Sequence, residues 1–250
     1  MRNLIVIPAY NEEAALATTV ERLQRLPAGF EILIVNDGSK DRTKDVAQAL
    51  VKSSTLPLHV ANLPVNCGIG VAVQTGYRFA VADGGYRHVI QFDADGQHDA
   101  EYLVALVEEC ERDNLDLCVG SRFIRDFGPG SRSTFSRRIG IRFFAWLIGV
   151  MSGAKVTDPT SGFRCLGPRA WRRFADSYPE DFPEPESLFW CARNKLRVGE
   201  LPVRMFERQG GVSSIRKLKS AYYMIKVSLA ILFDRIRRSE ATRVAPQPIA

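Results

Sequence analysis

Residues 4–26 read LIVIPAYNEEAALATTVERLQRL, and the fold class follows from the pattern of this stretch. The four apolar, mostly β-branched residues at 4–7 are typical of a buried strand. After the polar loop, apolar residues recur at Leu16, Val20 and Leu23, which is the spacing of one helix face. The stretch therefore predicts a strand, a loop and a helix in succession.

The same pattern recurs along the first half of the chain. A second strand is expected at 32–35, followed by a polar loop and a helix from Asp41. Further strands are expected at 58–61, 89–92 and 117–119, and further helices at 70–81 and around 103–107. Strands that alternate with helices predict an α/β fold, Rossmann-like, with a mainly parallel sheet, helices on both faces and right-handed crossovers.

Polar residues stand at the ends of several expected strands. Asn11, Asp37, Asp93 and Asp95 each come just after such a strand. Parallel strands present their carboxyl ends at one edge of a sheet, and ligands of open α/β sheets bind beyond that edge. We therefore expect these four side chains to converge on one site.

The pattern changes after Ser121. A loop at 122–138 precedes an apolar helix that ends near Met151, and a helix near 185–195 and a strand near 198–203 follow. The expected organisation is one globular domain over residues 1–215, a basic amphipathic helix at 216–238 and a disordered tail at 239–250.

The composition fits one globular unit whose second half is basic. The chain has 250 residues, 46% of them hydrophobic, and a formal net charge of +6. Arg and Lys gather after residue 120 and again between residues 204 and 238. Such an excess suits nucleic acid, anionic lipid or a phosphorylated substrate, and it is also typical of a solvated helix face.

The cysteines and the apolar stretches indicate in which cellular compartment the protein is expected. The five cysteines are odd in number and lack C-x-x-C spacing, which argues against a disulfide framework and a zinc site. The first apolar run is too short for a signal peptide, and no stretch is long enough to span a bilayer, so we expect a cytoplasmic protein. Residues 139–151 and 222–233 are apolar and accompanied by cations, which suits either an interfacial helix or a helix packed on the domain.

The triplet Asp93-Ala94-Asp95 offers two carboxylates that project to the same side of an extended backbone. Such a pair can hold one hard divalent cation together with the oxygens of a diphosphate. The triplet alone is weak evidence, because so short a pattern arises often by chance. Its place at the end of an apolar strand, just before the polar residues Gln97 and His98, favours a metal site.

Other motifs are ambiguous or exclude activities. Residues 37–39 (Asp-Gly-Ser) suit a hydrogen bond to a base or ribose, and equally a turn before a helix cap. Residues 67–70 are similar to the start of a dinucleotide-binding G-x-G-x-x-G motif, but Val73 stands where the third glycine belongs. The chain has no P-loop, H-E-x-x-H or G-x-S-x-G motif.

Five blocks taken together resemble the family 2 glycosyltransferases. They occur in order and at the family's spacing between residues 3 and 215, and they are most similar to the branch that contains dolichol- and polyprenol-phosphate mannosyltransferases. The blocks are VIPAYNEE (6–13), VNDGSKDRT (35–43), FDADGQH (92–98), GSR (120–122) and SGFR (161–164).

The resemblance implies a GT-A fold, a UDP- or GDP-sugar donor, Mg²⁺ or Mn²⁺, and inversion at the anomeric carbon. By position, Arg122 is expected near the phosphates, and Arg208 is expected to close over them. The implied nucleotide contacts are Pro8, Tyr10, Glu12, Asp37, Asp93, Ala94 and Asp95, and the implied metal ligands are Asp93, Asp95 and Gln97.

The acceptor implied by this branch is polyprenyl phosphate, with the enzyme peripheral at the inner face of the cytoplasmic membrane. The branch commonly has a Lys where this chain has Ser214, and Arg216 or Lys217 is a candidate substitute. A phosphate acceptor is already anionic, whereas a sugar hydroxyl needs a general base. The candidate bases are Asp158, Glu184 and Glu186. Glu186 is favoured because an expected helix begins just after it.

Three other activities stay open. A nucleotidyltransferase on a similar scaffold would release pyrophosphate, but the chain lacks a Gly-rich, Lys-bearing loop near its N-terminus. A non-catalytic nucleotide-sugar-binding protein would have no need to fill nearly all the metal and phosphate positions. DNA binding through the basic helix is weaker still. The expected partners are a nucleotide sugar and a polyprenyl-phosphate or glycan acceptor, without nucleic acid.

Overall fold

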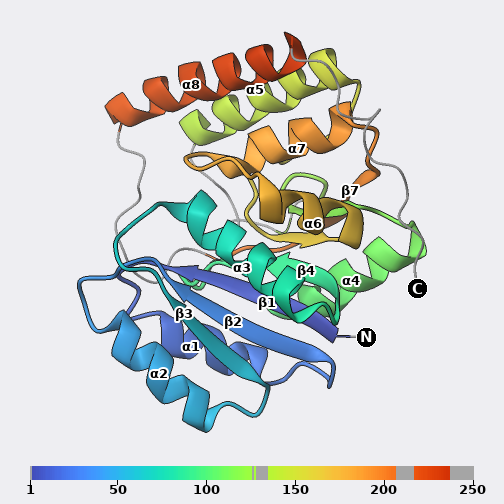
Figure 1. Cartoon of the computed structure of the whole chain (residues 1–250). Coiled ribbons are helices and arrows are strands. Elements are labelled where there is room, and N and C mark those ends of the chain that lie inside the picture. Colours follow the sequence, from blue (N-terminus) through green and yellow to red (C-terminus); the bar gives the residue numbers. More distant parts are fainter. Residues whose placement is uncertain (1, 126, 128–134, 207–216, 237–250) are drawn as a thin grey trace.

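A seven-stranded sheet forms the centre of the protein in the computed structural model, which describes residues 2–125, 127, 135–206 and 217–236 (Figure 1). The strands are β1 (Arg2–Ala9), β2 (Phe30–Asn36), β3 (Leu58–Asn62), β4 (Tyr86–Gln91), β5 (Leu117–Ser121), β6 (Arg164–Leu166) and β7 (Val198–Pro202). Their order in the sheet is β3-β2-β1-β4-β6-β5-β7. All pairs are parallel except those of β6, which is antiparallel to both β4 and β5.

Eight helices are present in the part of the chain that the structure describes. They are α1 (Leu16–Leu23), α2 (Thr43–Ser53), α3 (Ile69–Asp83), α4 (Tyr102–Arg112), α5 (Phe135–Ser152), α6 (Pro168–Asp176), α7 (Pro183–Arg193) and α8 (Lys217–Ile236). The first four connect successive strands, which is the alternation that the sequence predicts.

Two hydrophobic cores lie on opposite faces of the sheet. Ile5 and Ile7 of β1 belong to the core shared with α1, α2 and α4, whereas Leu4 and Val6 belong to the core shared with α3, α6 and α7. Successive residues of a strand point to opposite faces, so the continuous apolar run of β1 fills both cores. The expectation of a mainly parallel α/β fold with helices on both faces is confirmed.

Several boundaries differ from the expectation. β6 is only three residues long, which is too short to give a recognisable apolar period. α6 was not predicted although Pro168 suits a first helical turn and Ala170, Trp171 and Phe174 are buried at helical spacing. α5 begins at Phe135, inside the segment expected to be a loop.

The C-terminal basic helix packs on the domain through one side. Val227 and Ile231 of α8 are buried, and the Tyr223 ring lies 5.2 Å from that of Phe144 in α5. In Figure 1, α5 and α8 lie side by side beyond α7, on the side of α7 away from the sheet. The tail at 239–250, for which disorder is expected, lies outside the described residues.

Candidate active site

The carboxyl ends of β1, β2 and β4 lie next to one another because β1 pairs with both of the others. The register places Ala9 of β1 beside Asn36 of β2. The loops that follow these strands carry Asn11, Asp37 and Asp93, so the sheet brings together the segments that the sequence placed at one edge.

The loops after β1 and β2 bind each other. The Asn11 side-chain oxygen accepts a hydrogen bond from the Lys40 backbone N–H at 2.8 Å. The Glu12 backbone N–H donates to the Thr43 hydroxyl, also at 2.8 Å. Asn11 has a φ of 55°, in the left-handed region that Asn tolerates better than most residues. Several polar residues of these two sequence blocks therefore stabilise the loops themselves.

The side chains implied as nucleotide contacts differ in exposure. Tyr10 is 40% exposed, and Pro8 and Glu12 are half-buried, so these three line the outer part of the edge. Asp37 is buried. Of this set, Tyr10 is the most accessible to a base or ribose.

Asp37 organises the loop at residues 65–68. Its two carboxylate oxygens accept hydrogen bonds from the backbone N–H groups of Cys67 at 2.7 Å and Gly68 at 2.9 Å, and from the Asn66 side-chain amide at 2.9 Å. Three donors on one carboxylate fix its orientation. The sequence did not reveal this role, because the donors are about thirty residues away.

Gly38 permits the close approach of the same loop. Its φ is +63°, and a Cβ there would lie 2.3 Å from the backbone carbon of Val65. Gly38→Ala is expected to lower the unfolding free energy by about 1 to 3 kcal/mol from backbone strain alone, and to weaken donor binding by displacing residues 65–68. Gly84→Ala is the matched control, because Gly84 also has a positive φ but open space around it. Chemical denaturation and the KM for the donor separate the two effects, and equal KM values for both variants would contradict the assignment.

Asp93 and Asp95 follow β4 on a tight loop. Asp95 is 3% exposed and its Oδ1 accepts the Gln97 backbone N–H at 3.0 Å, whereas the Asp93 side chain is 28% exposed. The Ala94 carbonyl oxygen accepts a hydrogen bond from the Thr19 hydroxyl of α1 at 2.9 Å, which anchors the loop to the domain. The loop thus holds both carboxylates in defined positions.

The neighbours Gln97 and His98 have backbone partners. The His98 Nδ1 accepts the Asp93 backbone N–H at 3.0 Å, and its ring stacks on Phe163 with centroids 4.8 Å apart. The Gln97 carbonyl accepts the Phe206 backbone N–H at 2.8 Å, and the Gln97 side-chain amide donates to the Phe206 carbonyl at 3.5 Å. The geometry assigns His98 a structural role in the loop, which agrees with its burial.

This donor set fits a divalent cation that is shared with a substrate. Among the described residues no cluster of three or more His, Cys, Asp or Glu side chains is arranged to hold a metal ion. Mg²⁺ at diphosphate sites is commonly held by one or two carboxylates, with phosphate oxygens and water as the other ligands. Two hard carboxylates at Asp93 and Asp95 suit that arrangement and do not suit a closed protein cage.

The block at residues 161–164 lies against Asp93. A Cβ on Gly162 would come within 2.9 Å of the Asp93 Oδ2, so glycine lets this backbone approach the carboxylate. Arg164 is 1% exposed and ties the block to α7, because its guanidinium donates to the Ser161 carbonyl at 2.6 Å and to the Ser187 hydroxyl at 2.9 Å. Sequence reasoning assigned Arg164 no role.

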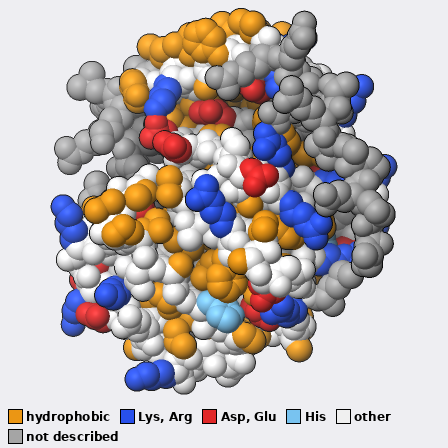
Figure 2. Space-filling model, in the orientation of Figure 1, with side chains coloured by type: hydrophobic (Ala, Val, Ile, Leu, Met, Phe, Trp, Pro, Cys, Tyr) orange, Lys and Arg blue, Asp and Glu red, His pale blue; other side chains and the backbone are white. Residues whose placement is uncertain are grey.

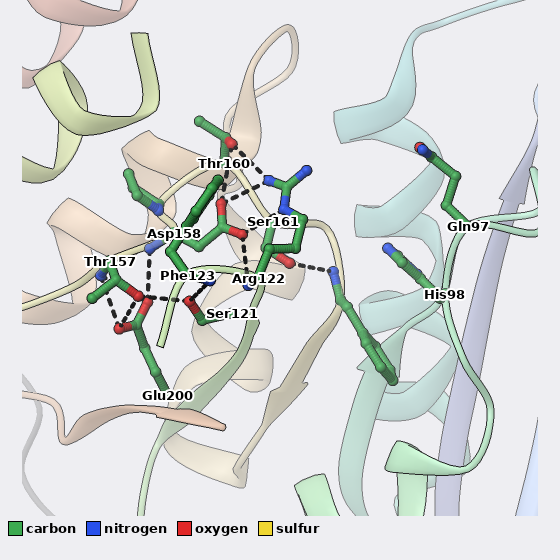
Figure 3. A network of polar contacts seen from close by, with 12 residues as sticks. Gln97, His98, Ser121, Arg122, Phe123, Thr157, Asp158, Thr160, Ser161 and Glu200 are labelled. Atoms are coloured by element: carbon green, nitrogen blue, oxygen red, sulfur yellow. Dashed lines mark hydrogen bonds and ion pairs between the residues drawn. The ribbon is translucent and has the colours of Figure 1, made fainter. Parts of the chain in front are cut away.

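Arg122 and Asp158 form a buried, bidentate ion pair. The Arg122 Nε and Nη2 donate to the two Asp158 oxygens at 2.6 and 2.7 Å, and the side chains are 8% and 0% exposed (Figure 3). Glu200 accepts hydrogen bonds from the backbone N–H groups of Thr157 and Asp158 and so fixes the loop that carries Asp158. Both Asp158 oxygens are therefore occupied by the Arg122 guanidinium, and a role of Asp158 as a general base stays a prediction.

Different charged groups act on Glu184 and Glu186. Burial raises the pKa of Glu186 to about 7, and the carboxylates of Asp234 in α8 and Glu184 contribute to the rise. Burial also raises the pKa of Glu184, while the Arg164 charge lowers it and the Asp93 charge raises it. The charges of Arg164 and Asp93 thus act on Glu184, and that of Asp234 acts on Glu186, while the role of either glutamate as a general base stays a prediction.

One predicted residue is not placed. Arg208, expected to close over the phosphates, and Ser214, where the branch commonly has Lys, lie within residues 207–216, outside the described ranges.

Known proteins are similar to this chain over most of its length. The family model described as glycosyl transferase family 2 matches residues 4–177. The undecaprenyl-phosphate mannosyltransferase of Micrococcus luteus is 30% identical over 222 residues, with 86% of this chain and 88% of that protein covered. A UDP-N-acetylglucosamine–dolichyl-phosphate N-acetylglucosaminyltransferase of Methanococcus voltae is 29% identical, with 92% and 97% covered.

A solved structure has the same fold. The glucosyl-3-phosphoglycerate synthase of Mycobacterium tuberculosis, in complex with Mn²⁺, UDP and phosphoglyceric acid, superposes with a TM-score of 0.64 at 19% identity. The alignment covers 94% of this chain and 78% of that one. The fold is GT-A, as the resemblance implied.

Proposed function

The chain belongs to glycosyl transferase family 2, and from this premise we propose that it transfers a hexose from a UDP- or GDP-sugar to the phosphate of a polyprenyl phosphate, with inversion. It is a glycosyltransferase. The observation that carries the proposal is the Asp93–Asp95 pair at the end of β4, beside the loops after β1 and β2. Such a transfer fits cell-envelope glycan or glycoconjugate synthesis.

The donor half of the site has residues for each part of the nucleotide sugar. Pro8, Tyr10, Glu12 and Asp37 are proposed to contact the base and ribose. Asp93, Ala94, Asp95 and Gln97 are proposed to hold the metal and the diphosphate. A bound Mg²⁺ or Mn²⁺ would neutralise charge that develops on the leaving diphosphate. Arg122, whose guanidinium is oriented by Asp158, is proposed to add a second positive charge beside that of the metal ion. Arg208 is proposed to add a third.

The acceptor proposal rests on names and on chemistry. Both relatives described above are named for transfer to a lipid phosphate, although their sugars differ. A phosphate monoester is largely anionic at neutral pH, so it needs neutralisation and positioning and no strong base. That fits a site in which Asp158 is already paired with Arg122.

The alternative acceptor is a sugar hydroxyl of a glycan or lipid-linked intermediate. For that reaction Glu184 and Glu186, which both stand in the first turn of α7, are the proposed bases. The family match and the relatives' names support glycosyl transfer over nucleotidyl transfer or binding without catalysis. Because the proposed acceptor is a membrane lipid, we also propose that the enzyme works at the inner face of the cytoplasmic membrane as a peripheral protein.

Incubation with a panel of UDP- and GDP-sugars, Mn²⁺ and a short-chain polyprenyl phosphate is expected to yield a lipid whose mass has increased by one hexosyl group. Release of an equimolar nucleoside diphosphate is expected at the same time. The matched control is the same polyprenol without its phosphate, which should stay unmodified. Transfer only to hydroxyl acceptors would refute the phosphate assignment, and release of pyrophosphate would refute glycosyl transfer.

A further inference from the structure

Exposed apolar side chains gather on two neighbouring helices. Of the sixteen large hydrophobic side chains that are exposed in the described ranges, ten lie on α5 and α8. Figure 2 shows apolar side chains along the edge of the molecule where these two helices lie in Figure 1. The ten residues, which we call the α5–α8 face, are Ile139, Phe143, Trp146, Val150, Tyr222, Ile225, Leu229, Leu232, Phe233 and Ile236.

Spacing and packing show that the α5–α8 face is a surface distinct from the core. Its residues on α5 recur at intervals of four, three and four, which is one stripe of a helix. The opposite sides of both helices are buried through Phe144 and Ile148 of α5 and through Val227 and Ile231 of α8. Trp146 is 61% exposed and Ile236 is 72% exposed, which is unusual for side chains of this size.

The margins of the α5–α8 face are cationic. Arg142 is an exposed neighbour of the stripe on α5, and Arg235 is exposed on α8. The sequence of α5 contains no Asp or Glu, and the acidic residue of α8, Asp234, pairs with Arg193. An apolar stripe bordered by Arg and Lys is the pattern of a helix that lies in the interface of an anionic membrane.

We propose that the α5–α8 face docks on the surface of a bilayer that contains anionic lipid, with both helices lying in the plane of the interface. The proposal rests on the proposed function, because a polyprenyl-phosphate acceptor is held in that bilayer. No helix in the described part of the chain is long and apolar enough to cross a membrane, so the two helices would lie on the bilayer without spanning it.

Charge disfavours a second copy of the chain as the occupant. A symmetric dimer through this face would bring two surfaces with the same cationic margins together, and α5 carries no carboxylate to compensate them. An anionic lipid surface supplies the missing negative charge. Burial of aromatic and aliphatic side chains in the interface supplies the apolar contribution.

The α5–α8 face is mechanically connected to the catalytic site through α7. Arg193, near the end of α7, donates to the backbone carbonyl of Asp234 in α8, and Ser187 of α7 receives the hydrogen bond from the buried Arg164. Glu184 stands at the start of the same helix. Docking through α5 and α8 would therefore set the distance between the bilayer and the acceptor side of the site.

The test is co-sedimentation of the whole protein with phosphatidylcholine vesicles that contain phosphatidylglycerol, without donor or acceptor. Wild-type protein is expected to bind and to show a blue shift of Trp146 fluorescence. The pairs Trp146→Ser with Val150→Ser, and Leu229→Ser with Phe233→Ser, are each expected to weaken binding by at least about 10-fold. The matched control pair is Val51→Ser with Val81→Ser, which removes exposed apolar side chains from α2 and α3 and is expected to leave binding unchanged.

A second measurement separates this proposal from the proposed function. With a short-chain polyprenyl phosphate in free solution, the α5 and α8 variants are expected to keep wild-type turnover, because none of the altered residues belongs to the proposed site. Wild-type protein that transfers sugar in solution but does not sediment would overturn the docking proposal alone. A wild-type dimer that dissociates in the variants, with unchanged vesicle binding, would also overturn it. If the wild-type protein binds vesicles and the variants do not, docking is supported even if no lipid phosphate is glycosylated. The missing glycosylation would then count only against the proposed acceptor.

Discussion

Asp95→Asn is expected to lower the turnover of sugar transfer by about 10³-fold, which corresponds to about 4 kcal/mol of transition-state stabilisation. The substitution keeps the shape of the side chain, and the Asn oxygen can still accept the Gln97 backbone N–H that Asp95 binds at 3.0 Å. What it removes is one of the two negative charges proposed to hold the cation. The fold is therefore expected to stay intact, with an unchanged circular dichroism spectrum.

Metal titration gives a second readout for the same variant. A site with only two carboxylates and the Gln97 amide should bind Mn²⁺ weakly, and binding should strengthen when a nucleoside diphosphate adds its phosphate oxygens. Asp95→Asn is expected to weaken Mn²⁺ binding both with and without UDP or GDP. Asp99→Asn is the matched control, because Asp99 is also buried but pairs with Arg204. A folded Asp95→Asn enzyme with wild-type turnover would refute the metal assignment.

The strands β1 and β2 could be predicted because the centre of each is a continuous apolar run. Residues 4–7 and 32–35 are buried on both faces, so every position in them is apolar and the strands stand out from their polar loops. β6 gives no such signal, because its three residues begin with Arg164, whose buried guanidinium is stabilised by the nearby Ser161 carbonyl and by the distant Ser187 hydroxyl of α7. Long-range compensation of this kind leaves no local pattern.

The sequence predicts the location of a site residue where the end of a strand determines it. It does not predict contacts between side chains that are far apart along the chain. Asp93 comes two residues after the end of β4, so its place at the sheet edge follows from the strand. The pairing of Arg122 with Asp158 joins residues 36 positions apart, and the support from Glu200 spans a further 42. The choice between Glu184 and Glu186 as a base could not be predicted, because the two glutamates are only two positions apart in the first turn of α7.

A double-variant cycle at Arg122 and Asp158 is expected to show that Asp158 acts through Arg122. Arg122→Gln and Asp158→Asn should each lower the unfolding free energy by about 3 to 5 kcal/mol, because each leaves the partner's charge buried and unpaired. The double variant should lose clearly less than the sum, since it buries no unpaired charge. Urea unfolding of the four proteins measures this coupling.

Turnover in the same cycle separates positioning from proton transfer. Arg122→Gln is expected to slow transfer by about 10²-fold, because it removes a charge proposed to stabilise the leaving diphosphate. If Asp158 only orients that charge, the double variant will be no slower than Arg122→Gln. A general base would instead contribute about 10²- to 10⁴-fold on its own, so the double variant would be slower by that further factor. Assays below the lowest Tm of the set keep every variant folded. Glu200→Gln retains one oxygen acceptor for the backbone of Asp158, so its turnover is expected to lie between those of the wild type and Asp158→Asn.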